Sequence, residues 1–256
     1  MNTSSAFYDQ LTPFYHLLFP DWETSIRRQA AALDGIIREY LGEQAQTVLD
    51  VACGIGTQAL GLAALGYTLT ASDLSREAVE RARREAQARG LHLDLSVADM
   101  REAYTHHQRE FDVVMACDNA LPHLLTDEEL LRAFQQFHLC TRPGGLCLIS
   151  VRDYDKEERS GVQVRPYGVR VERGTRYLLF QVWEFDGPFY DLAMYFIEDR
   201  GGSDVETRVM RSKYYAVGTD RLMALMREAG FRDVQRLDDR FYQPVIIGKR
   251  EAHSSS

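Results

Sequence analysis

A carboxylate and two glycines early in the chain have the types and spacing of a site for a charged organic ligand. Asp50 interrupts an apolar run of strand type, where an unpaired carboxylate would be costly to bury. Gly54 and Gly56 follow, and because they lack a Cβ they let a ligand approach the backbone closely. A helical pattern begins directly after them, and the first N–H groups of a helix have no partner within the helix. The stretch 47–57 therefore predicts a strand, a glycine turn and a helix start that bind a nucleotide-type cofactor.

The charge of Asp50 distinguishes between two cofactors. The spacing Gly54-x-Gly56-x-x-Ala59 also fits the dinucleotide fingerprint, in which the turn holds a pyrophosphate. A carboxylate beside a pyrophosphate is electrostatically unfavourable, whereas it would stabilise a ligand that carries an ammonium and a sulfonium group. S-adenosylmethionine (SAM) is such a ligand, so the acid favours SAM over NAD.

A second acid lies at the end of the next predicted strand. Asp73 follows Asp50 by 23 residues, an offset that suits an acid accepting hydrogen bonds from both ribose hydroxyls of an adenosyl group. The alternative is that Asp73 caps the helix that follows. Asp99 and Met100 end the third predicted strand. All these positions fall at the carboxyl ends of parallel strands, where α/β sheets bind their ligands.

The run Leu49-Asp50-Val51-Ala52-Cys53-Gly54-Ile55-Gly56 closely resembles motif I of the class I SAM-dependent methyltransferases. In that family an acid at the position of Asp99 takes the adenine amino group, the next residue packs on the adenine ring, and Leu74 would pack on its other face. The family also has an N-terminal arginine for the SAM carboxylate, which could be Arg27 or Arg28 here. The resemblance thus implies SAM as cofactor and a set of cofactor-binding residues: Asp50, Ala52, Gly54, Gly56, Asp73, Leu74, Asp99, Met100, Cys117 and Arg27.

Two later sequences are similar to those of glycine and sarcosine N-methyltransferases. Asn119 and His123 follow the fourth predicted strand, and Arg152-x-Tyr154-Asp155 follows the fifth. The resemblance implies that Arg152 holds a substrate carboxylate, a role that suits the planar fork of a guanidinium. It also implies that Asn119 and Tyr154 orient the nucleophile and that His123 contacts the substrate.

Structural roles are the alternatives for two of these residues. Arg152 could form a salt bridge with Asp153 or Asp155, and His123 could be a packed or capping histidine. The segment that follows departs from the glycine and sarcosine enzymes. Tyr167 is the nearest counterpart of their further substrate tyrosine.

Residues 7–22 are dense in aromatic side chains and contain Pro13 and Pro20, which forbid one continuous helix. The pattern predicts a short amphipathic segment that packs over a cleft. Most of its rings are expected to cover the core. Tyr8 and Tyr15 carry hydroxyls and are the candidates for substrate contacts.

The order of the predicted elements indicates the fold. Strands and helices alternate through residue 151, which predicts a parallel sheet with helices on both faces. We expect a doubly wound, mostly parallel, seven-stranded Rossmann-like α/β sheet with an antiparallel last strand and an inserted antiparallel β lid. Aromatic and β-branched residues punctuated by glycines predict lid strands at 177–185, 189–198 and 206–217. The expected division is an N-terminal helical cap (1–46), a SAM-binding core (47–154 and 218–250) and the lid (155–217).

Composition narrows the class of partner. The formal net charge of −8 argues against a surface that binds nucleic acid. A cluster of basic residues is interleaved with Glu80 and Glu85, which favours a solvated helix face; it comprises Arg81, Arg83, Arg84 and Arg89. The four cysteines have no metal-ligand or C-x-x-C spacing, and no apolar run is long enough to span a membrane. We expect a cytoplasmic monomer or homodimer that binds neither nucleic acid nor membrane, and no metal.

These features together predict an enzyme, a SAM-dependent methyltransferase that acts on a small molecule. The nitrogen of an amino acid such as glycine or sarcosine is the first expectation for the methyl acceptor. The alternatives are an O-methyltransferase that acts on a larger metabolite, an NAD-dependent oxidoreductase and a non-catalytic SAM-binding protein.

Overall fold

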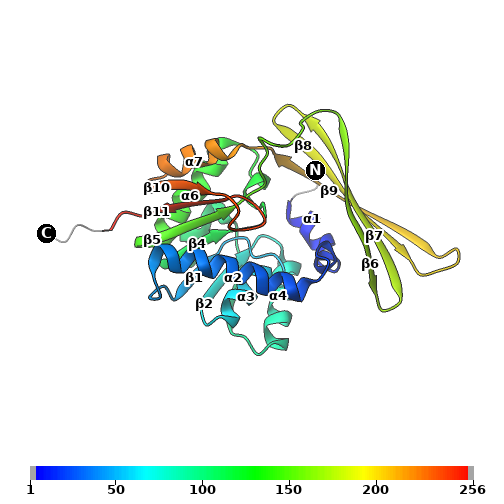
Figure 1. Ribbon diagram of the computed structural model, residues 1–256, viewed down its shortest axis with the longest axis horizontal. Helices are drawn as coiled ribbons and strands as arrows, with labels where there is room; N and C mark the ends of the chain where they lie inside the picture. The colour runs from blue at the N-terminus through cyan, green and yellow to red at the C-terminus, as the bar shows by residue number, and fades with distance from the viewer. Residues whose placement is uncertain (1–3, 253–256) are drawn as a thin grey trace.

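A seven-stranded sheet forms the centre of the computed structural model, which describes residues 4–252 (Figure 1). The strand order is β10-β11-β5-β4-β1-β2-β3, and every pairing is parallel except the two made by β11. The predicted mostly parallel sheet with an antiparallel last strand is therefore confirmed. Its strands are β1 (Thr47–Asp50), β2 (Thr68–Asp73), β3 (Leu93–Val97), β4 (Phe111–Ala116), β5 (Thr141–Ser150), β10 (Arg232–Leu237) and β11 (Val245–Lys249).

Helices cover both faces of this sheet because neighbouring residues of its central strands point in opposite directions. Val48 packs with α2 and α3 on one face, and Leu49 packs with α6 and α7 on the other; both residues are fully buried. The helices are α1 (Ser4–Leu11), α2 (Trp22–Leu41), α3 (Thr57–Ala64), α4 (Arg76–Ala88), α5 (Ala103–His107), α6 (Asp127–Cys140) and α7 (Thr219–Glu228), with 3-10 turns η1 (Tyr15–Leu18), η2 (Met100–Glu102) and η3 (Leu121–His123).

A separate antiparallel sheet of four strands is inserted between β5 and α7, as predicted. It comprises β6 (Val162–Glu172), β7 (Thr175–Asp186), β8 (Phe189–Asp199) and β9 (Val205–Tyr215), in that spatial order. Helix α1 and the turn after it lie between this sheet and the core (Figure 1). The inner side chains of the β6–β9 sheet are buried in the same hydrophobic cluster as α1 and α6.

Two strand boundaries differ from the prediction. Strand β6 was not predicted, because Pro166 and Gly168 break the alternation of its side chains; the structure accommodates both at a β-bulge. The sequence Arg142-Pro143-Gly144-Gly145 is typical of a tight turn, but β5 already begins at Thr141. Its pairing with β4 shifts register between Phe111 and Val113, so the strand absorbs the proline and glycines as an irregularity.

The packing of α2 on α3 depends on a glycine. A Cβ on Gly61 would lie 2.6 Å from the Cβ of Ala30 and 2.7 Å from the carbonyl oxygen of Ile26, so the helices would have to separate. We expect Gly61→Ala to lower the free energy of unfolding by about 1–3 kcal/mol, as overpacking does. Gly35→Ala is the matched control, since a Cβ on this helical glycine meets nothing within 4 Å. That substitution should leave the stability unchanged or raise it by up to about 1 kcal/mol.

Urea unfolding of both variants measures the difference. Equal stability of Gly61→Ala and the parent would show that α2 and α3 are not held at this separation.

Among residues 4–252 no helix has the length and apolar character needed to cross a membrane, and no group of three metal-ligating side chains is placed to hold an ion.

Candidate active site

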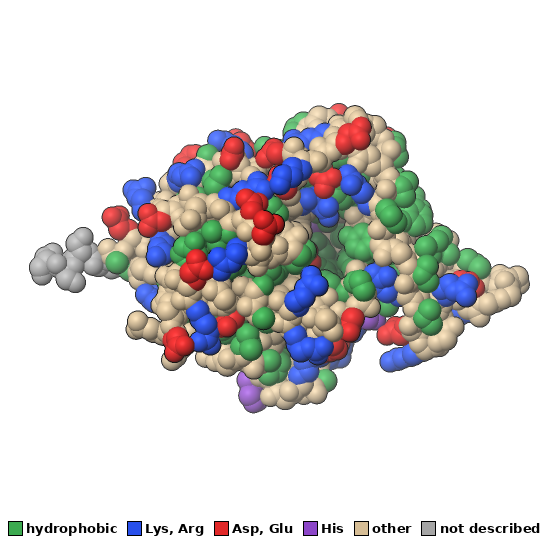
Figure 2. Space-filling view, viewed as in Figure 1, with side chains coloured by type: hydrophobic (Ala, Val, Ile, Leu, Met, Phe, Trp, Pro, Cys, Tyr) green, Lys and Arg blue, Asp and Glu red, His purple; other side chains and the backbone are tan. Residues whose placement is uncertain are grey.

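Two cavities adjoin at the carboxyl ends of the central strands, where the order of the sheet reverses between β1 and β4. The first, which we call the cofactor cavity, lies over the β1–α3 turn and the ends of β2 and β3. The second, which we call the acceptor cavity, has a volume of about 480 Å³ and lies between the core, α1 and the β6–β9 sheet. Figure 2 shows the surface hollowed there. Tyr8, Tyr15 and Asp118 line both cavities, so the cavities meet at these three residues.

The glycine turn after β1 is built from left-handed backbone. Gly54 has φ 51° and Gly56 has φ 95°, and a Cβ on Gly56 would lie 3.1 Å from Leu60. Both positions therefore favour glycine. Gly54 lines the cofactor cavity, whereas Gly56 does not and serves the turn and its packing.

Asp73 is held rigidly at the edge of the cofactor cavity. Its Oδ2 accepts a hydrogen bond from the Gly54 N–H at 2.8 Å, and its Oδ1 accepts one from the Ser75 N–H at 2.9 Å. Ser75, rather than Asp73, caps α4 with its side chain. Burial raises the pKa of Asp73, although these N–H donors oppose the rise. Each carboxylate oxygen keeps acceptor capacity for a ligand, because it has used only part of it.

Asp50 lies beneath the turn instead of lining the cavity. It is 1% exposed; its Oδ1 accepts from the Ala52 N–H at 3.2 Å, and its Oδ2 is buried without a hydrogen-bond partner among the described residues. Burial raises the pKa of Asp50 to about 7. An unpaired carboxylate at this depth is a source of negative potential below the turn.

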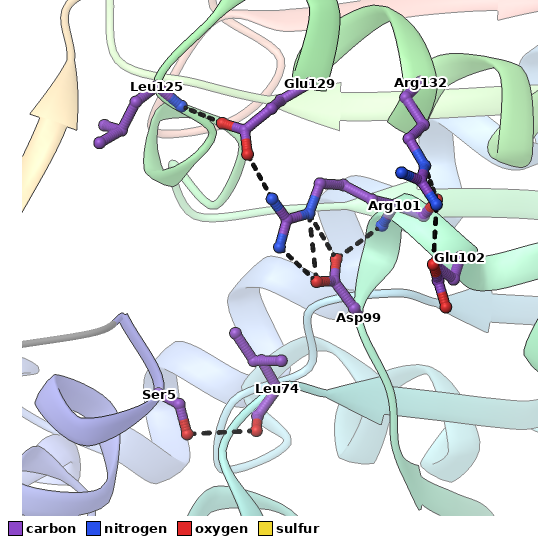
Figure 3. Close-up of polar contacts among 8 residues, drawn as sticks. All are labelled: Ser5, Leu74, Asp99, Arg101, Glu102, Leu125, Glu129 and Arg132. Atoms are coloured by element: carbon purple, nitrogen blue, oxygen red, sulfur yellow. Dashed lines mark hydrogen bonds and ion pairs between the residues drawn. The ribbon is translucent and has the colours of Figure 1, made fainter.

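The far end of the cofactor cavity is closed by an ion-pair network (Figure 3). Arg101 binds both oxygens of Asp99, at 2.6 Å for the shortest contact, and also pairs with Glu129. The Arg101 guanidinium lowers the pKa of Asp99 against the opposing effect of burial. Asp99 also caps η2, because its side chain accepts a hydrogen bond from the Arg101 N–H at 2.8 Å.

Helix α1 covers the cofactor cavity from the other side. The Ser5 hydroxyl donates to the carbonyl of Leu74 at 3.4 Å (Figure 3), and the Ser75 hydroxyl donates to Asp9 at 2.5 Å. Of the residues predicted to bind the cofactor, seven line this cavity: Ala52, Gly54, Asp73, Leu74, Asp99, Met100 and Cys117. Arg27 does not; it lies on the exposed side of α2 and donates to Thr24, while the neighbouring Arg28 lines the acceptor cavity.

Arg152 lines the acceptor cavity, but neither salt bridge considered as its alternative role forms. Its Nη1 donates to Glu157 at 3.3 Å, and its guanidinium lies 4.9 Å from the centre of the Trp183 ring. Asp153 pairs with Arg236 and Asp155 with Arg159 instead. The Nε of Arg152 is buried without a partner among the described residues. A cation with a free donor on the wall of a cavity is suited to an anionic ligand group.

Asn119 and Tyr154 form a link between strands β4 and β5. The Asn119 Nδ2 donates to the Tyr154 hydroxyl at 2.7 Å, and its Oδ1 accepts from the Arg152 N–H at 3.0 Å. The Tyr154 hydroxyl also bonds that of Tyr190 at 2.9 Å. Asn119 lines the acceptor cavity, but Tyr154 is fully buried behind its wall. Asn119 therefore faces the acceptor cavity, and Tyr154 contacts it from a buried position.

His123 lines the cofactor cavity and not the acceptor cavity. Its Nε2 is 2.8 Å from the Tyr8 hydroxyl, and its Nδ1 is 3.5 Å from that of Ser212. Burial lowers the pKa of His123 to about 3, so the ring is neutral at physiological pH. The histidine therefore holds Tyr8, which reaches both cavities. Tyr167, the remaining predicted substrate residue, lines the acceptor cavity.

Asp118 was not singled out from the sequence, where it reads as part of a polar turn. The structure places it after β4 with φ 58°, in the left-handed region, and Asn119 follows with φ 65°. Such strained positions are typical of functional sites. Burial raises the pKa of Asp118, against the opposing effects of the Tyr242 hydroxyl and the Arg152 cation. Asp118 is the one acid shared by the two cavities among the described residues.

Comparison with known sequences identifies the domain that carries the cofactor cavity. Residues 48–145 match the family described as methyltransferase domain. The chain is 30% identical over 145 residues to a glycine/sarcosine N-methyltransferase of Parasynechococcus marenigrum, covering 57% of this chain and 50% of that protein. It is 32% identical over 111 residues to a ubiquinone biosynthesis O-methyltransferase of Azoarcus sp., covering 43% and 46%. The chain spans about half the length of these curated relatives.

Solved structures agree in fold over nearly the whole chain. DesVI of Streptomyces venezuelae has a TM-score of 0.80 with 21% identity, covering 93% of this chain and 97% of its own. The SAM-bound amino pentose methyltransferase CalS10 of Micromonospora echinaspora has a TM-score of 0.77 with 18% identity, covering 88% and 92%. At these identities the likeness concerns the fold.

Proposed function

Because this chain carries a class I SAM-dependent methyltransferase domain, we propose that it transfers a methyl group to the nitrogen of a small molecule that also bears a carboxylate. The observation that supports this proposal most is the placement of Asp118 and Arg152. An acid lies where the two cavities meet, and a cation with a free donor lies on the wall of the acceptor cavity.

The residues of the cofactor cavity fit SAM. Asp73 has two fixed oxygens for the ribose hydroxyls, and Gly54 leaves the backbone accessible. The orphaned Oδ2 of Asp50 below the turn suits the positive charges at the methionine end. Leu74 and Met100 would flank the adenine. When bound, SAM supplies an activated methyl group on a sulfonium, so the protein needs chiefly to position the acceptor and to exclude water.

The charge of Asp50 leads to a prediction about pH. Its pKa of about 7 in the ligand-free protein means that the carboxylate is protonated below this pH, and a proton then competes with a cationic ligand. We expect the Kd for SAM to rise up to about tenfold per pH unit below about pH 7. Asp50→Asn should flatten this dependence. Isothermal titration calorimetry at about pH 5.5 and about pH 8 tests it; equal affinity of the parent at both would contradict the role of Asp50.

The acceptor cavity favours a substrate larger than glycine. Its volume of about 480 Å³ lies within the range of about 300–1,000 Å³ found for pockets that bind drug-sized ligands. Glycine and sarcosine would be the smallest members of the substrate class that Arg152 selects. We further propose that segment 155–217 acts as a lid, since its inner face supplies Trp183, Tyr190 and Tyr214 to the cavity wall.

Asp118 is suited to prepare the nucleophile. An amine is protonated near neutral pH and must lose a proton before its lone pair can attack the methyl carbon. In our proposal the Asp118 carboxylate takes this proton, the new N–C bond forms, and the S–C bond breaks with its electrons moving to sulfur. Tyr8 and Tyr15, whose hydroxyls remain protonated because burial raises their pKa values, border the same junction.

Asp118→Asn should slow methyl transfer at neutral pH by about 10²–10⁴-fold, the usual contribution of a general base. The rate of this variant should rise toward alkaline pH, where the substrate loses its proton to solvent. Asp118→Glu should retain part of the activity. The pH profile of kcat/KM is the measurement, and a profile of Asp118→Asn that is parallel to that of the parent would show that Asp118 takes no proton.

The proposed function is tested with matched acceptors and labelled SAM. Each amine, from glycine to larger amino acids, is compared with its own amide, which lacks the carboxylate. We expect turnover of at least one acid and much slower turnover of its amide.

The cavity volume also favours a second candidate, an O-methyltransferase for a larger metabolite. Turnover of phenols or other hydroxyl acceptors, without turnover of any amine, would replace the first proposal by the second.

A further inference from the structure

The outer face of the β6–β9 sheet carries an uncovered apolar surface. Of the eleven large hydrophobic residues that are exposed in the described part of the chain, six lie on this face, with Val171 72% and Val162 65% exposed. Hydrophobic side chains gather over this sheet in Figure 2. We call this surface the outer sheet face; its apolar members are Val162, Val164, Pro166, Val169 and Val171 of β6, Leu178, Phe180 and Val182 of β7, Ala193, Tyr195 and Ile197 of β8, and Val205 and Val209 of β9.

The strand register arranges these residues in rows across the sheet. The central row is Pro166, Phe180, Tyr195 and Val209, in which the Phe180 and Tyr195 rings stack at 4.7 Å. Charged side chains occur mainly in two rows near the ends of the strands. One of these holds Glu184, Asp191 and Lys213, and the other holds Arg176 and Asp199. An apolar centre with a charged rim is the composition of a protein–protein interface.

We propose that the outer sheet face binds a second copy of this chain, with the two sheets packed face to face. The four strands at about 4.8 Å spacing and about ten residues at about 3.3 Å rise give a face of about 600 Å². Two such faces bury about 1,200 Å² in total, which reaches the size of a specific interface. Two sheets stack face to face in this way in β-sandwiches.

The edges of the β6–β9 sheet are less suited than its outer face to binding a second copy. Strand β9 packs against α1 and η3, so β6 is the free edge. It carries Pro166 and a bulge between Pro166 and Gly168, both of which obstruct the addition of another strand. The edge is therefore protected against pairing, while the face is not covered.

The rim charges select one two-fold arrangement. Glu184 and Arg176 lie on β7 at equal distances from Phe180, on opposite sides. A two-fold axis that crosses the strands at Phe180 therefore brings Glu184 opposite Arg176 of the partner copy, and Val164 opposite Val169. The same axis opposes Asp191 and Asp199, whose charges are compensated within each copy by Lys213 at 3.2 Å and by Arg176 at 3.1 Å. An axis along the strands would oppose Arg176 and Asp199, but it would leave Glu184 opposite Asp191, which is also acidic. Glu184 forms no ion pair within the described residues, whereas Asp191 pairs with Lys213 at 3.2 Å.

Sedimentation velocity of the full chain tests the proposal. The parent should sediment with twice the 29.3 kDa mass of the chain. Val164→Lys/Val169→Lys should lower the sedimenting mass to that of one chain, because four lysines then meet across the two-fold axis of the dimer. Both positions are more than half exposed in one copy, so the fold should tolerate the change. Leu65→Lys/Leu139→Lys, at exposed leucines 48% and 41% accessible on the core, is the matched control and should leave the dimer intact.

The arrangement is tested by exchange of the rim charges. Glu184→Arg should raise the dimer Kd about tenfold or more, and Glu184→Arg/Arg176→Glu should recover most of the loss. Far-UV circular dichroism verifies that each variant is folded. A parent of single mass at every concentration, or a dimer whose mass survives Val164→Lys/Val169→Lys, overturns the proposal. A dimer that responds to the lysines but not to the charge exchange overturns the two-fold arrangement.

Discussion

Arg152→Lys should lose turnover of a carboxylate-bearing amine while SAM affinity stays at the parent value. Lysine keeps the positive charge but presents no planar fork, and it cannot extend along the Trp183 ring as the guanidinium does at 4.9 Å. Loss of a charged hydrogen bond costs about 1.5–3 kcal/mol, so kcat/KM should fall about ten- to more than a hundred-fold. Steady-state kinetics with the acid substrate, together with calorimetric titration of SAM, measures both quantities.

Arg165→Lys is the matched control. Arg165 also lies 4.9 Å from the Trp183 ring and pairs with the same Glu157, but it does not line the acceptor cavity. We expect this variant to retain kcat/KM within a few-fold. Equal losses in the two variants would mean that the arginines act together to hold Trp183, and that Arg152 does not recognise a carboxylate.

Asp73→Ala should weaken SAM binding about tenfold or more. The change removes the charged acceptor proposed for the ribose hydroxyls, at a cost of about 1.5–3 kcal/mol. It also leaves the N–H groups of Gly54 and Ser75 without their partner, so thermal unfolding must be recorded beside the titration. Asp73→Asn keeps the shape and should have a smaller effect on stability.

Asp94→Ala provides the comparison for Asp73. Asp94 is an exposed acid on the neighbouring strand β3, and its one ion pair, with Arg109, is 4.0 Å long. This variant should bind SAM as the parent does. Asp73→Ala that folds normally and binds SAM with parental affinity would show that the ribose is held elsewhere.

The parts of the site that follow from local sequence were predictable. The strand, the glycine turn and the helix start between Asp50 and Thr57 are encoded within one short segment. An acid within an apolar run indicates a ligand, because a buried carboxylate without a partner is costly, and Asp50 has an oxygen of this kind. Asp73 and Asp99 could be placed because they end strands of the same parallel sheet, and such ends share one edge. The same reasoning gave the seven-stranded sheet and its antiparallel last strand.

The acceptor side depends on features that sequence spacing does not contain. Asp118 and Asn119 adopt left-handed backbone, which turns one toward the cavity junction and ties the other to Tyr154 and Arg152. Tyr154 is buried, and its hydroxyl is hydrogen-bonded to that of Tyr190, which comes from a distant strand of the inserted sheet. Contacts between residues far apart in the chain decide these positions, so the spacing of Asn119, Arg152 and Tyr154 in the sequence does not show which of them faces the cavity.

The position of the transferred methyl group distinguishes N-methyl transfer from O-methyl transfer most directly. The purified chain is incubated with SAM carrying a ¹³C-methyl group and with an acid substrate found in the acceptor comparison, and the product is examined by ¹³C NMR and mass spectrometry. We expect one added methyl group bonded to the substrate nitrogen, with the carboxylate unmodified. A label bonded to oxygen, or no transfer to any amine that carries a carboxylate, would contradict it.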